Sequence, residues 1–310
     1  MDKTIVIGTR SSELAMWQAN HAADAIRERY PEKTVKILGI MTKGDKILDT
    51  PLARIGGKGL FTNELEASLL RGEIDMAVHS LKDVPAVLPD GLKISAIMKR
   101  EDAHDVLVSS KYRTFQSLPN GAKIGTSSLR RGAQLLHARG DLHICSLRGN
   151  VNTRLRKLEE DHFDAVILAK AGLIRLGLAE RVTEVLPLDL CLPAAGQGVM
   201  VIETRDNDRE TEETIRFLHH EQTAQAVAAE RAFLVRVEGS CQVPVGVHAQ
   251  ISGEHISADA VIASLDGVRF IRDHEEGNTA EAADVGNRLA QKILDEGGLA
   301  VMRELGLLEG

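Results

Sequence analysis

Residues 4–41, TIVIGTRSSELAMWQANHAADAIRERYPEKTVKILGIM, decide the fold class of this chain. An apolar run at 4–7 predicts a strand, and Ser11 or Ser12 can cap a following helix that extends to about Tyr30. A second apolar run at 35–41 predicts the next strand. The expected buried face of the helix carries Leu14, Trp17, Ala22, Ala25 and Ile26. A strand, helix, strand order predicts a parallel sheet that is covered by helices.

The alternation continues through the first two thirds of the chain. Asn63 and Glu66 resemble a capping box for a helix that ends at Gly72. The remaining elements that we expect here are strands at 74–78, 92–98, 123–126, 142–147, 164–169 and 199–203, and helices at 127–138, 150–160 and 171–177. Polar or flexible breaks are expected at 99–104 and 193–198.

The last third has a different pattern. We expect an Ala-rich helix followed by alternating strands and a final helix, at 221–237, 245–251, 255–262, 268–272 and 280–294. This order is typical of a small α+β domain. A chain of 310 residues is too long for one ordinary core, so two or three domains are expected.

Composition excludes several classes of protein. The net charge of −7 argues against a nucleic-acid binder, and no apolar stretch reaches about 18 residues, so no membrane span is expected. The N-terminus shows no secretory signal, so we expect a cytoplasmic protein. Three distant cysteines argue against a disulfide framework, and Cys145 and Cys191 are interpreted as small buried residues. The histidines have no metal-ligand spacing, so no metal site is expected.

Arginines are concentrated in the loops and helix starts that follow the predicted strands. Helix N-termini that follow strand ends attract anions through their backbone N–H groups. A guanidinium pairs with a carboxylate through two hydrogen bonds. This pattern therefore predicts a cleft for a polyanion. The segment 56–59, GGKG, lacks the spacing of a Walker phosphate loop. It fits better as a mobile loop that closes over an anionic ligand.

Asp83 and Cys241 each allow two interpretations. Asp83 follows a predicted buried strand and precedes Pro85, so it is either a turn residue or a carboxylate that stabilises cationic intermediates. Cys241 follows a Gly-Ser turn, so it is either a small buried residue or an exposed thiol; no adjacent cation lowers its pKa.

Seven segments together resemble the porphobilinogen deaminase family. They run in the family's order across nearly the whole chain, which makes the set specific although each one alone is weak. The segments are 8–15 (GTRSSELA), 56–61 (GGKGLF), 77–85 (AVHSLKDVP), 125–131 (GTSSLRR), 146–154 (SLRGNVNTR), 192–198 (LPAAGQG) and 238–244 (EGSCQVP).

The resemblance implies an α/β fold with two lobes like those of type II periplasmic-binding proteins and a small α+β C-terminal domain. The implied domains are 1–98 with 199–218, 104–192, and 219–310. The implied enzyme is a monomeric transferase of haem biosynthesis that acts on porphobilinogen and has no nucleic-acid or membrane partner. It condenses four porphobilinogen molecules head to tail with loss of ammonia, and hydrolysis then releases linear hydroxymethylbilane.

The resemblance also implies residue roles. Cys241 would hold a dipyrromethane cofactor through a thioether, and Asp83 would be the catalytic carboxylate. Cofactor and substrate would be bound by Arg10, Ser12, Lys58, Ser80, Lys82, Thr126, Ser127, Ser128, Arg130, Arg131, Arg148, Arg154, Gly172, Arg175 and Gln197. Each pyrrole brings an acetate and a propionate group, which explains the arginines. The main alternative is a non-catalytic anion-binding protein of the same two-lobed fold, with no adduct on Cys241.

Overall fold

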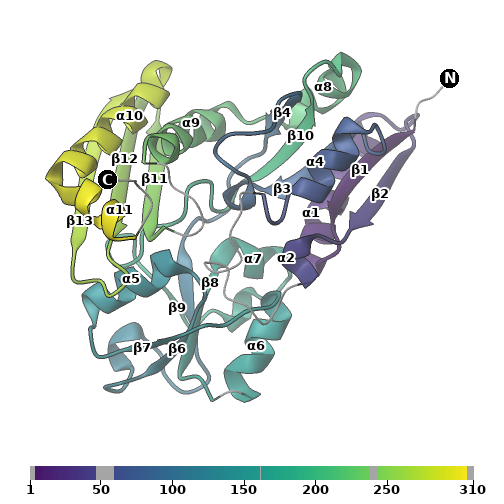
Figure 1. Ribbon diagram of the computed structural model, residues 1–310. Helices are drawn as coiled ribbons and strands as arrows, with labels where there is room; N and C mark the ends of the chain where they lie inside the picture. The colour runs from purple at the N-terminus through teal and green to yellow at the C-terminus, as the bar shows by residue number, and fades with distance from the viewer. Residues whose placement is uncertain (1–3, 47–58, 161, 238–242, 306–310) are drawn as a thin grey trace.

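The computed structural model describes residues 4–46, 59–160, 162–237 and 243–305. Within these ranges the chain forms three sheets, each packed with its own helices (Figure 1). We call the bodies built on the first two sheets lobe 1 and lobe 2, and the body built on the third the C-terminal domain. No helix in the described ranges is long and apolar enough to cross a bilayer.

Lobe 1 has a five-stranded sheet in the order β2-β1-β3-β10-β4. β1 runs parallel to β2 and β3, whereas β10 is antiparallel to both of its neighbours. The strands are β1 (Ile5–Arg10), β2 (Val35–Ile40), β3 (Met76–Ser80), β4 (Leu92–Ile97) and β10 (Met200–Arg205). The helices are α1 (Glu13–Arg29), α2 (Lys43–Lys46), α4 (Asn63–Leu70), α8 (Arg209–Ile215) and the 3₁₀ turns η1 (Leu81–Asp83) and η4 (Arg216–Leu218).

Helices α1 and α4 cover opposite faces of the lobe 1 sheet. The buried face of α1 and the N-terminal cap of α4 both differ from those expected from the sequence. Ser12 caps α1 as predicted, but Trp17 is 37% exposed, and the buried face of α1 runs through Ala15, Gln18, Ala19, Ala22, Ala23 and Ile26. Leu14 and Trp17 lie instead on the side of α1 that meets lobe 2. The predicted capping box is wrong, because Asn63 is itself the first residue of α4 and its N-cap, Thr62, makes no side-chain cap bond.

Lobe 2 repeats the strand order, with β7-β6-β8-β5-β9. Its strands are β5 (Asp105–Val108), β6 (Lys123–Gly125), β7 (His143–Cys145), β8 (Ala165–Ala169) and β9 (Glu184–Val185). Its helices are α5 (Leu129–Ala138), α6 (Val151–Glu160), α7 (Lys170–Arg175) and the 3₁₀ turns η2 (Phe115–Ser117) and η3 (Ala179–Arg181). Leu135 of α5 packs on one face of the sheet, and Leu155 and Leu173 pack on the other.

Both sheets are mixed, so the expectation of parallel sheets is wrong for one strand in each lobe, which runs antiparallel to both of its neighbours. β10 in lobe 1 and β5 in lobe 2 occupy the fourth place of their sheets and run antiparallel to β3 and β8. The physical reason is the path of the chain. β5 and β10 are the strands that follow the two crossings between lobes, 99–104 and 192–199, and each enters its sheet from the opposite end. The α/β fold class with two similar lobes is confirmed.

The C-terminal domain is the expected small α+β unit. Helices α9 and α10 pack on a three-stranded antiparallel sheet through Phe233, Val285 and Leu289. Its elements are α9 (Glu221–Arg236), β11 (Val245–Ser252), β12 (His255–Ala263), β13 (Phe270–Asn278), η5 (Thr279–Glu281), α10 (Ala282–Ile293), the π turn η6 (Leu294–Gly298) and α11 (Leu299–Glu304). In Figure 1, α9 lies between this domain and strands β4 and β10 of lobe 1.

The two crossings between the lobes touch each other at Gly198. The amide of Glu101 donates to the Gly198 carbonyl at 3.1 Å. Gly198 has a φ of +83°, and a Cβ there would lie 2.3 Å from the Glu101 carbonyl oxygen, so only glycine fits. The crossings therefore behave as one joint.

A buried carboxylate fastens this joint to lobe 2. Asp105 is fully buried and accepts hydrogen bonds from Arg130 at 2.6 Å, Arg131 at 2.7 Å and Gln197 at 2.9 Å. Burial raises the pKa of Asp105, but the charges and hydrogen bonds of the two arginines outweigh burial and hold the pKa well below its usual range. Two buried guanidinium groups thus depend on one carboxylate.

Removal of this carboxylate should destabilise the protein strongly. In Asp105→Asn the two buried arginines keep their positive charges but lose the negative carboxylate that balances them. The free energy of unfolding should therefore fall by about 3–5 kcal/mol. Urea unfolding followed by circular dichroism measures the change. Asp141→Asn is the control, because Asp141 pairs with Arg139 at the surface and its loss should change little. Equal unfolding curves for Asp105→Asn and wild type would contradict this account.

Candidate active site

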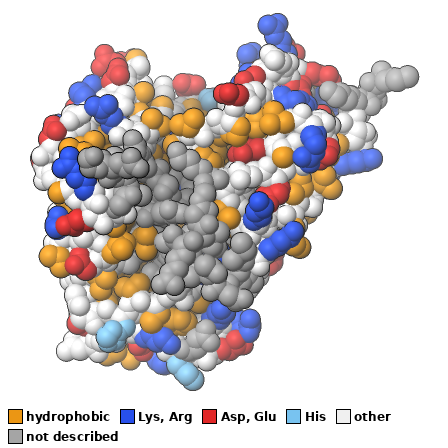
Figure 2. Space-filling view, viewed as in Figure 1, with side chains coloured by type: hydrophobic (Ala, Val, Ile, Leu, Met, Phe, Trp, Pro, Cys, Tyr) orange, Lys and Arg blue, Asp and Glu red, His pale blue; other side chains and the backbone are white. Residues whose placement is uncertain are grey.

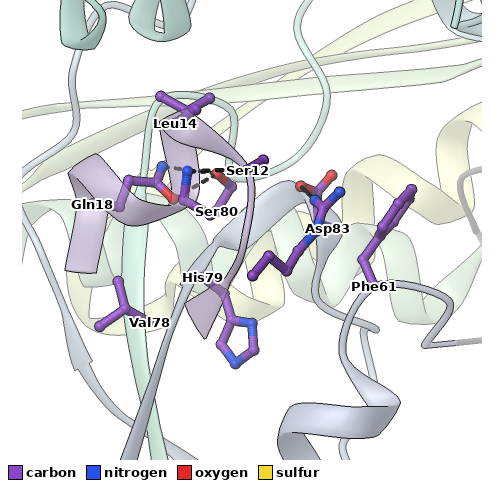
Figure 3. A pocket seen from close by; sticks show the side chains of 10 residues that line it. Ser12, Leu14, Gln18, Phe61, Val78, His79, Ser80 and Asp83 are labelled. Atoms are coloured by element: carbon purple, nitrogen blue, oxygen red, sulfur yellow. Dashed lines mark hydrogen bonds and ion pairs between the residues drawn. The ribbon is translucent and has the colours of Figure 1, made fainter. Parts of the chain in front are cut away.

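The carboxyl ends of β1 and β3 open into a hollow in lobe 1. These strands are parallel neighbours, so Arg10 at the end of β1 and Ser80 at the end of β3 emerge on the same edge. The residues that line the hollow are Arg10, Ser12, Leu14, Ala15, Gln18, Phe61, Val78, His79, Ser80 and Asp83 (Figure 3). The structure therefore brings together the two polar segments that follow β1 and β3.

Asp83 lies at the edge of this hollow beside Arg10. It is the last residue of η1, and its Oδ2 is 3.7 Å from Arg10 Nη1. The Asp83 side chain is 33% exposed, so its carboxylate has room to contact a ligand.

Arg10 is itself held in place from two further sides. Its Nε and Nη2 donate to the carboxylate of Asp45, and its guanidinium lies 4.1 Å from the centre of the Phe61 ring. Burial raises the pKa of Asp45, but the hydrogen bonds and charge of Arg10 outweigh burial and lower it. The guanidinium is therefore oriented before any ligand arrives.

Sequence analysis missed three members of this site. Gln18 is 1% exposed and donates from Nε2 to Ser80 Oγ at 2.8 Å. A polar residue on the apolar stripe of α1 is the signal that could have identified it. Asp45 and Phe61 carry no such signal, because only the fold brings them to Arg10.

Lobe 2 contributes hydroxyl groups that follow β6. Ser128 Oγ caps α5 by accepting from the amide of Arg131 at 3.4 Å, and Thr126 Oγ1 accepts from the amide of Ser128 at 3.1 Å. Ser127 Oγ lies 3.1 Å from Ser146 Oγ. Ser12 of lobe 1 likewise caps α1. These predicted ligand-binding hydroxyls thus also shape helix starts, where backbone N–H groups favour anions.

Arg154 interacts electrostatically with charged groups of both lobes. Arg154 Nε donates to the Gly149 carbonyl at 2.8 Å, which fixes the side chain at the start of α6. The pKa of Arg154 is lowered to about 10, mainly by burial and in addition by the charges of Arg131, Arg148 and Arg10, while Asp83 opposes this effect. Arg10 and Asp83 belong to lobe 1 and the other residues to lobe 2, so charged groups of both lobes lie within reach of one another.

Lys82 adds a further cation beside Asp83. Burial lowers the pKa of Lys82 to about 8, the charges of Arg131 and Arg130 lower it too, and Asp83 and Asp105 partly oppose them. Burial is the main cause of both lowered pKa values, but among the charged groups that act on Lys82 and Arg154 the arginines outnumber the carboxylates Asp83 and Asp105. Such an excess fits a ligand that carries several carboxylates.

Other predicted site residues have different surroundings. Arg130, Arg131 and Gln197 gather around Asp105, where their polar atoms already have protein partners. Arg175 donates to the Gly198 carbonyl at 2.7 Å and lies 6.0 Å from the Trp17 ring centre. A Cβ on Gly172 would lie 3.6 Å from Leu14, so this glycine marks the close approach of α7 to α1. Ligand roles for these residues stay predictions.

Lys58 and Cys241 lie outside the described residues. Cys191 is buried as expected, and burial raises the pKa of its thiol to about 12. Cys145 is only half-buried, so its interpretation as a buried residue is wrong. Among the described residues, no group of three or more His, Cys, Asp or Glu side chains is arranged to hold a metal ion.

The outer surface contrasts with this concentration of cations. Over the described part of the face in Figure 2, acidic and basic side chains are interspersed and do not form one basic field. A broad basic face is what a nucleic-acid duplex would need. The cations described above around Asp83 instead gather where groups of the two lobes lie within reach of one another.

Comparison with known proteins identifies the family. Residues 5–213 match the model described as "Porphobilinogen deaminase, dipyromethane cofactor binding domain", and residues 224–295 match the porphobilinogen deaminase C-terminal domain. The chain belongs to the porphobilinogen deaminase family. It therefore contains the family's dipyrromethane cofactor binding domain, and the cationic surroundings of Asp83 fit a cofactor with several carboxylates.

Relatives match over almost the whole chain. The porphobilinogen deaminase of Pelotomaculum thermopropionicum is 51% identical over 98% of this chain and 97% of its own length. That of Trichlorobacter lovleyi is 52% identical with the same coverage. Among solved structures, the periplasmic aliphatic sulphonate binding protein SsuA from Escherichia coli is 16% identical, with a TM-score of 0.42 over 77% of this chain and 71% of that one.

The lowered pKa of Lys82 can be tested in ligand-free protein. Because its pKa is about 8, the ammonium should lose its proton as the pH rises through 8, and with it the affinity for carboxylates. NMR of ¹³C-dimethylated lysines should show one signal that titrates near pH 8. The signal should vanish in Lys82→Arg and persist in the control Lys292→Arg. If every lysine signal titrated above pH 10, the proposed surroundings of Lys82 would be wrong.

Proposed function

We propose that this protein condenses four porphobilinogen molecules head to tail with loss of ammonia, and then releases linear hydroxymethylbilane by hydrolysis, as a transferase of haem biosynthesis. One observation carries the proposal beyond family membership. The carboxylate of Asp83 stands beside Arg10 of its own lobe and interacts electrostatically with Arg154 of the other lobe. The substrate carries several carboxylates, which need cations to bind them. It also becomes a cationic pyrrole during the reaction, and that charge needs a carboxylate beside it.

Asp83 acts on the reacting pyrrole. Its carboxylate accepts a hydrogen bond from the pyrrole N–H and stabilises the positive charge that develops as ammonia leaves. It also takes part in the proton transfer that completes each addition. Arg10, fixed by Asp45 and Phe61, forms an ion pair with Asp83 and orients its carboxylate. Together these residues favour the transition state over the bound substrate.

The cations bind the acetate and propionate groups. Arg148 and Arg154 hold them from lobe 2, and Arg10 and Lys82 hold them from lobe 1. The remaining binding residues that we propose are Ser12, Lys58, Ser80, Thr126, Ser127, Ser128, Arg130, Arg131, Gly172, Arg175 and Gln197. A hinge at the two crossings lets the lobes separate as the chain grows.

We further propose that Cys241 holds dipyrromethane through a thioether. When bound, this cofactor supplies the pyrrole carbon to which the first substrate unit is joined. The Cys241 thiolate is the nucleophile that fixes it to the protein. In the sequence Cys241 follows α9, whose Val227 packs against the turn that carries Asp83.

The proposed domain division is 1–98 with 199–218, 104–192, and 219–310. The membership of β10 in the lobe 1 sheet supports the discontinuous first domain. We also propose that the protein works as a monomer in the cytoplasm, with porphobilinogen as its substrate. The family resemblance supports the oligomeric state, the compartment and the substrate that we propose.

Intact mass tests the cofactor tether. Purified wild-type protein should exceed its sequence mass by two pyrrole units, because the thioether survives denaturation. The excess should be absent from Cys241→Ser and present in the control Cys145→Ser. A non-catalytic anion-binding protein of the same fold would show no excess, and that result would overturn the proposal.

Replacement of Asp83 tests the catalytic carboxylate. Asp83→Ala should retain the two-pyrrole mass and the fold but lower turnover of porphobilinogen by at least about 100-fold, because the developing charge loses its stabilising partner. Asp24→Ala, which removes an exposed carboxylate of α1, is the control and should keep its activity. Near-normal turnover by Asp83→Ala would remove Asp83 from the mechanism.

A further inference from the structure

The turn that carries Asp83 has few anchors of its own. At its start, the amide of Leu81 donates to the Val199 carbonyl at 2.9 Å, and at its end the amide of Val84 donates to the Leu81 carbonyl at 3.0 Å. The next residue is Pro85, which has no N–H to donate. The position of Asp83 therefore depends on what holds the chain just after it.

An arginine from the C-terminal domain holds this stretch. Arg231 of α9 donates from Nη2 to the carbonyls of Pro85 and Ala86 at 2.9 and 2.8 Å. These contacts join residues about 145 positions apart in sequence. One nitrogen thus bridges two consecutive carbonyls, which fixes the direction of the backbone that leaves Asp83.

Apolar packing supports the same contact. Val227, one helical turn before Arg231, belongs to a buried cluster with Leu81, Val84, Val199 and Val201. Leu81 and Val84 flank Lys82 and Asp83 in sequence. The same face of α9 therefore packs against η1 and bonds to the residues that follow it.

The charge of Arg231 has a partner in lobe 1. Burial lowers the pKa of Arg231, and the carboxylate of Glu203 in β10 opposes this effect. Glu203 is fully buried and its Oε2 lies 2.9 Å from His79 Nε2. His79 is the penultimate residue of β3, the strand that leads into η1. Arg231 thus interacts with the residues that follow Asp83 and with Glu203, which in turn contacts the strand that leads into η1.

Helix α9 also leads directly to the cofactor cysteine. It ends at Arg236, five residues before Cys241 in the sequence. No other helix in the described ranges both contacts η1 and adjoins the Cys241 segment.

We propose that Arg231 is a positioning residue for Asp83, because it holds from α9 the residues that directly follow this carboxylate. The proposal rests on the proposed function. It deepens that function by assigning the C-terminal domain a part in catalysis beyond the tether. Arg231 touches neither substrate nor cofactor in this role.

Kinetics of three variants test the proposal. Arg231→Ala should retain the two-pyrrole mass and lower kcat about 10- to 100-fold, because a small displacement of Asp83 is costly. KM should change less than about threefold, because the cations that bind carboxylates are untouched. Arg231→Lys retains a cationic donor for the two carbonyls and should recover most of the lost kcat. Arg288→Ala is the matched control: Arg288 is an exposed arginine of the same domain that also donates to a backbone carbonyl, Glu276.

Several outcomes would overturn the proposal. The first two are an unchanged kcat in Arg231→Ala and a loss of kcat that Arg231→Lys does not recover. The other two are an equal loss of kcat in Arg288→Ala and a fall in kcat/KM that comes from a raised KM alone. Absence of the two-pyrrole mass from Arg231→Ala would instead place Arg231 in cofactor assembly and would also reject the positioning role.

Hydrogen exchange provides a test that does not depend on turnover. The amides of residues 81–88 should exchange faster in Arg231→Ala than in wild type or Arg288→Ala, while exchange in β11 and β12 stays the same. If Arg231→Ala fails to fold, Arg231→Lys is compared in its place and should show a smaller effect in the same segment. Unchanged exchange there would refute the contact. If the wild type lacked turnover, the proposed function would fail while this exchange result still decided whether Arg231 holds the turn.

Discussion

The buried carboxylate of Asp105 is the interaction on which the two-lobed arrangement depends. It lies where the chain enters lobe 2, and it accepts hydrogen bonds from two arginines of α5 and from Gln197 of the returning crossing. Buried guanidinium groups without a counter-charge would cost several kcal/mol. One carboxylate thus joins both crossings to lobe 2, and the crossings determine how the carboxyl ends of the two sheets face each other.

This arrangement divides the arginines between two tasks. Arg130, Arg131 and Arg175 bind protein oxygens at the joint, whereas Arg10 of lobe 1 and Arg154 of lobe 2 both interact with Asp83, and Arg148 interacts with Arg154. The first group uses its hydrogen bonds inside the protein. The second leaves an excess of positive charge, which a chain of pyrrole carboxylates can neutralise. A protein with a net charge of −7 thereby offers a focused site for a polyanion.

The C-terminal domain is more than an attachment point for the cofactor. Its helix α9 packs against the turn that carries Asp83 and ends five residues before Cys241 in the sequence. The same helix contacts the crossings between the lobes, because the Glu230 carboxylate accepts hydrogen bonds from Arg100 at 2.8 Å and from the Gly196 amide at 2.7 Å. The C-terminal domain therefore meets both the turn of Asp83 and the joint between the lobes.

Sequence analysis correctly predicted most elements where periodicity is strong, but it misjudged several boundaries and faces. The helix cap at Ser12 was predictable because capping depends on a few neighbouring residues. The exposure of Trp17 was not, because Leu14 and Trp17 meet lobe 2 and only the docking of lobes reveals a second contact face on α1. The antiparallel β5 and β10 were also missed, since strand direction depends on chain path and not on local pattern.

The sequence by itself determined the alternation of strands and helices, the separate character of the last third, and the family through seven ordered motifs. These features depend on short-range periodicity and on residue identity, both of which can be read along the chain. Only the tertiary structure decided which arginines pair with Asp105 and which surround Asp83, and that Gln18, Asp45 and Arg231 support the site. Such partners are brought together by packing between elements far apart in sequence, and no local pattern encodes a contact of that kind.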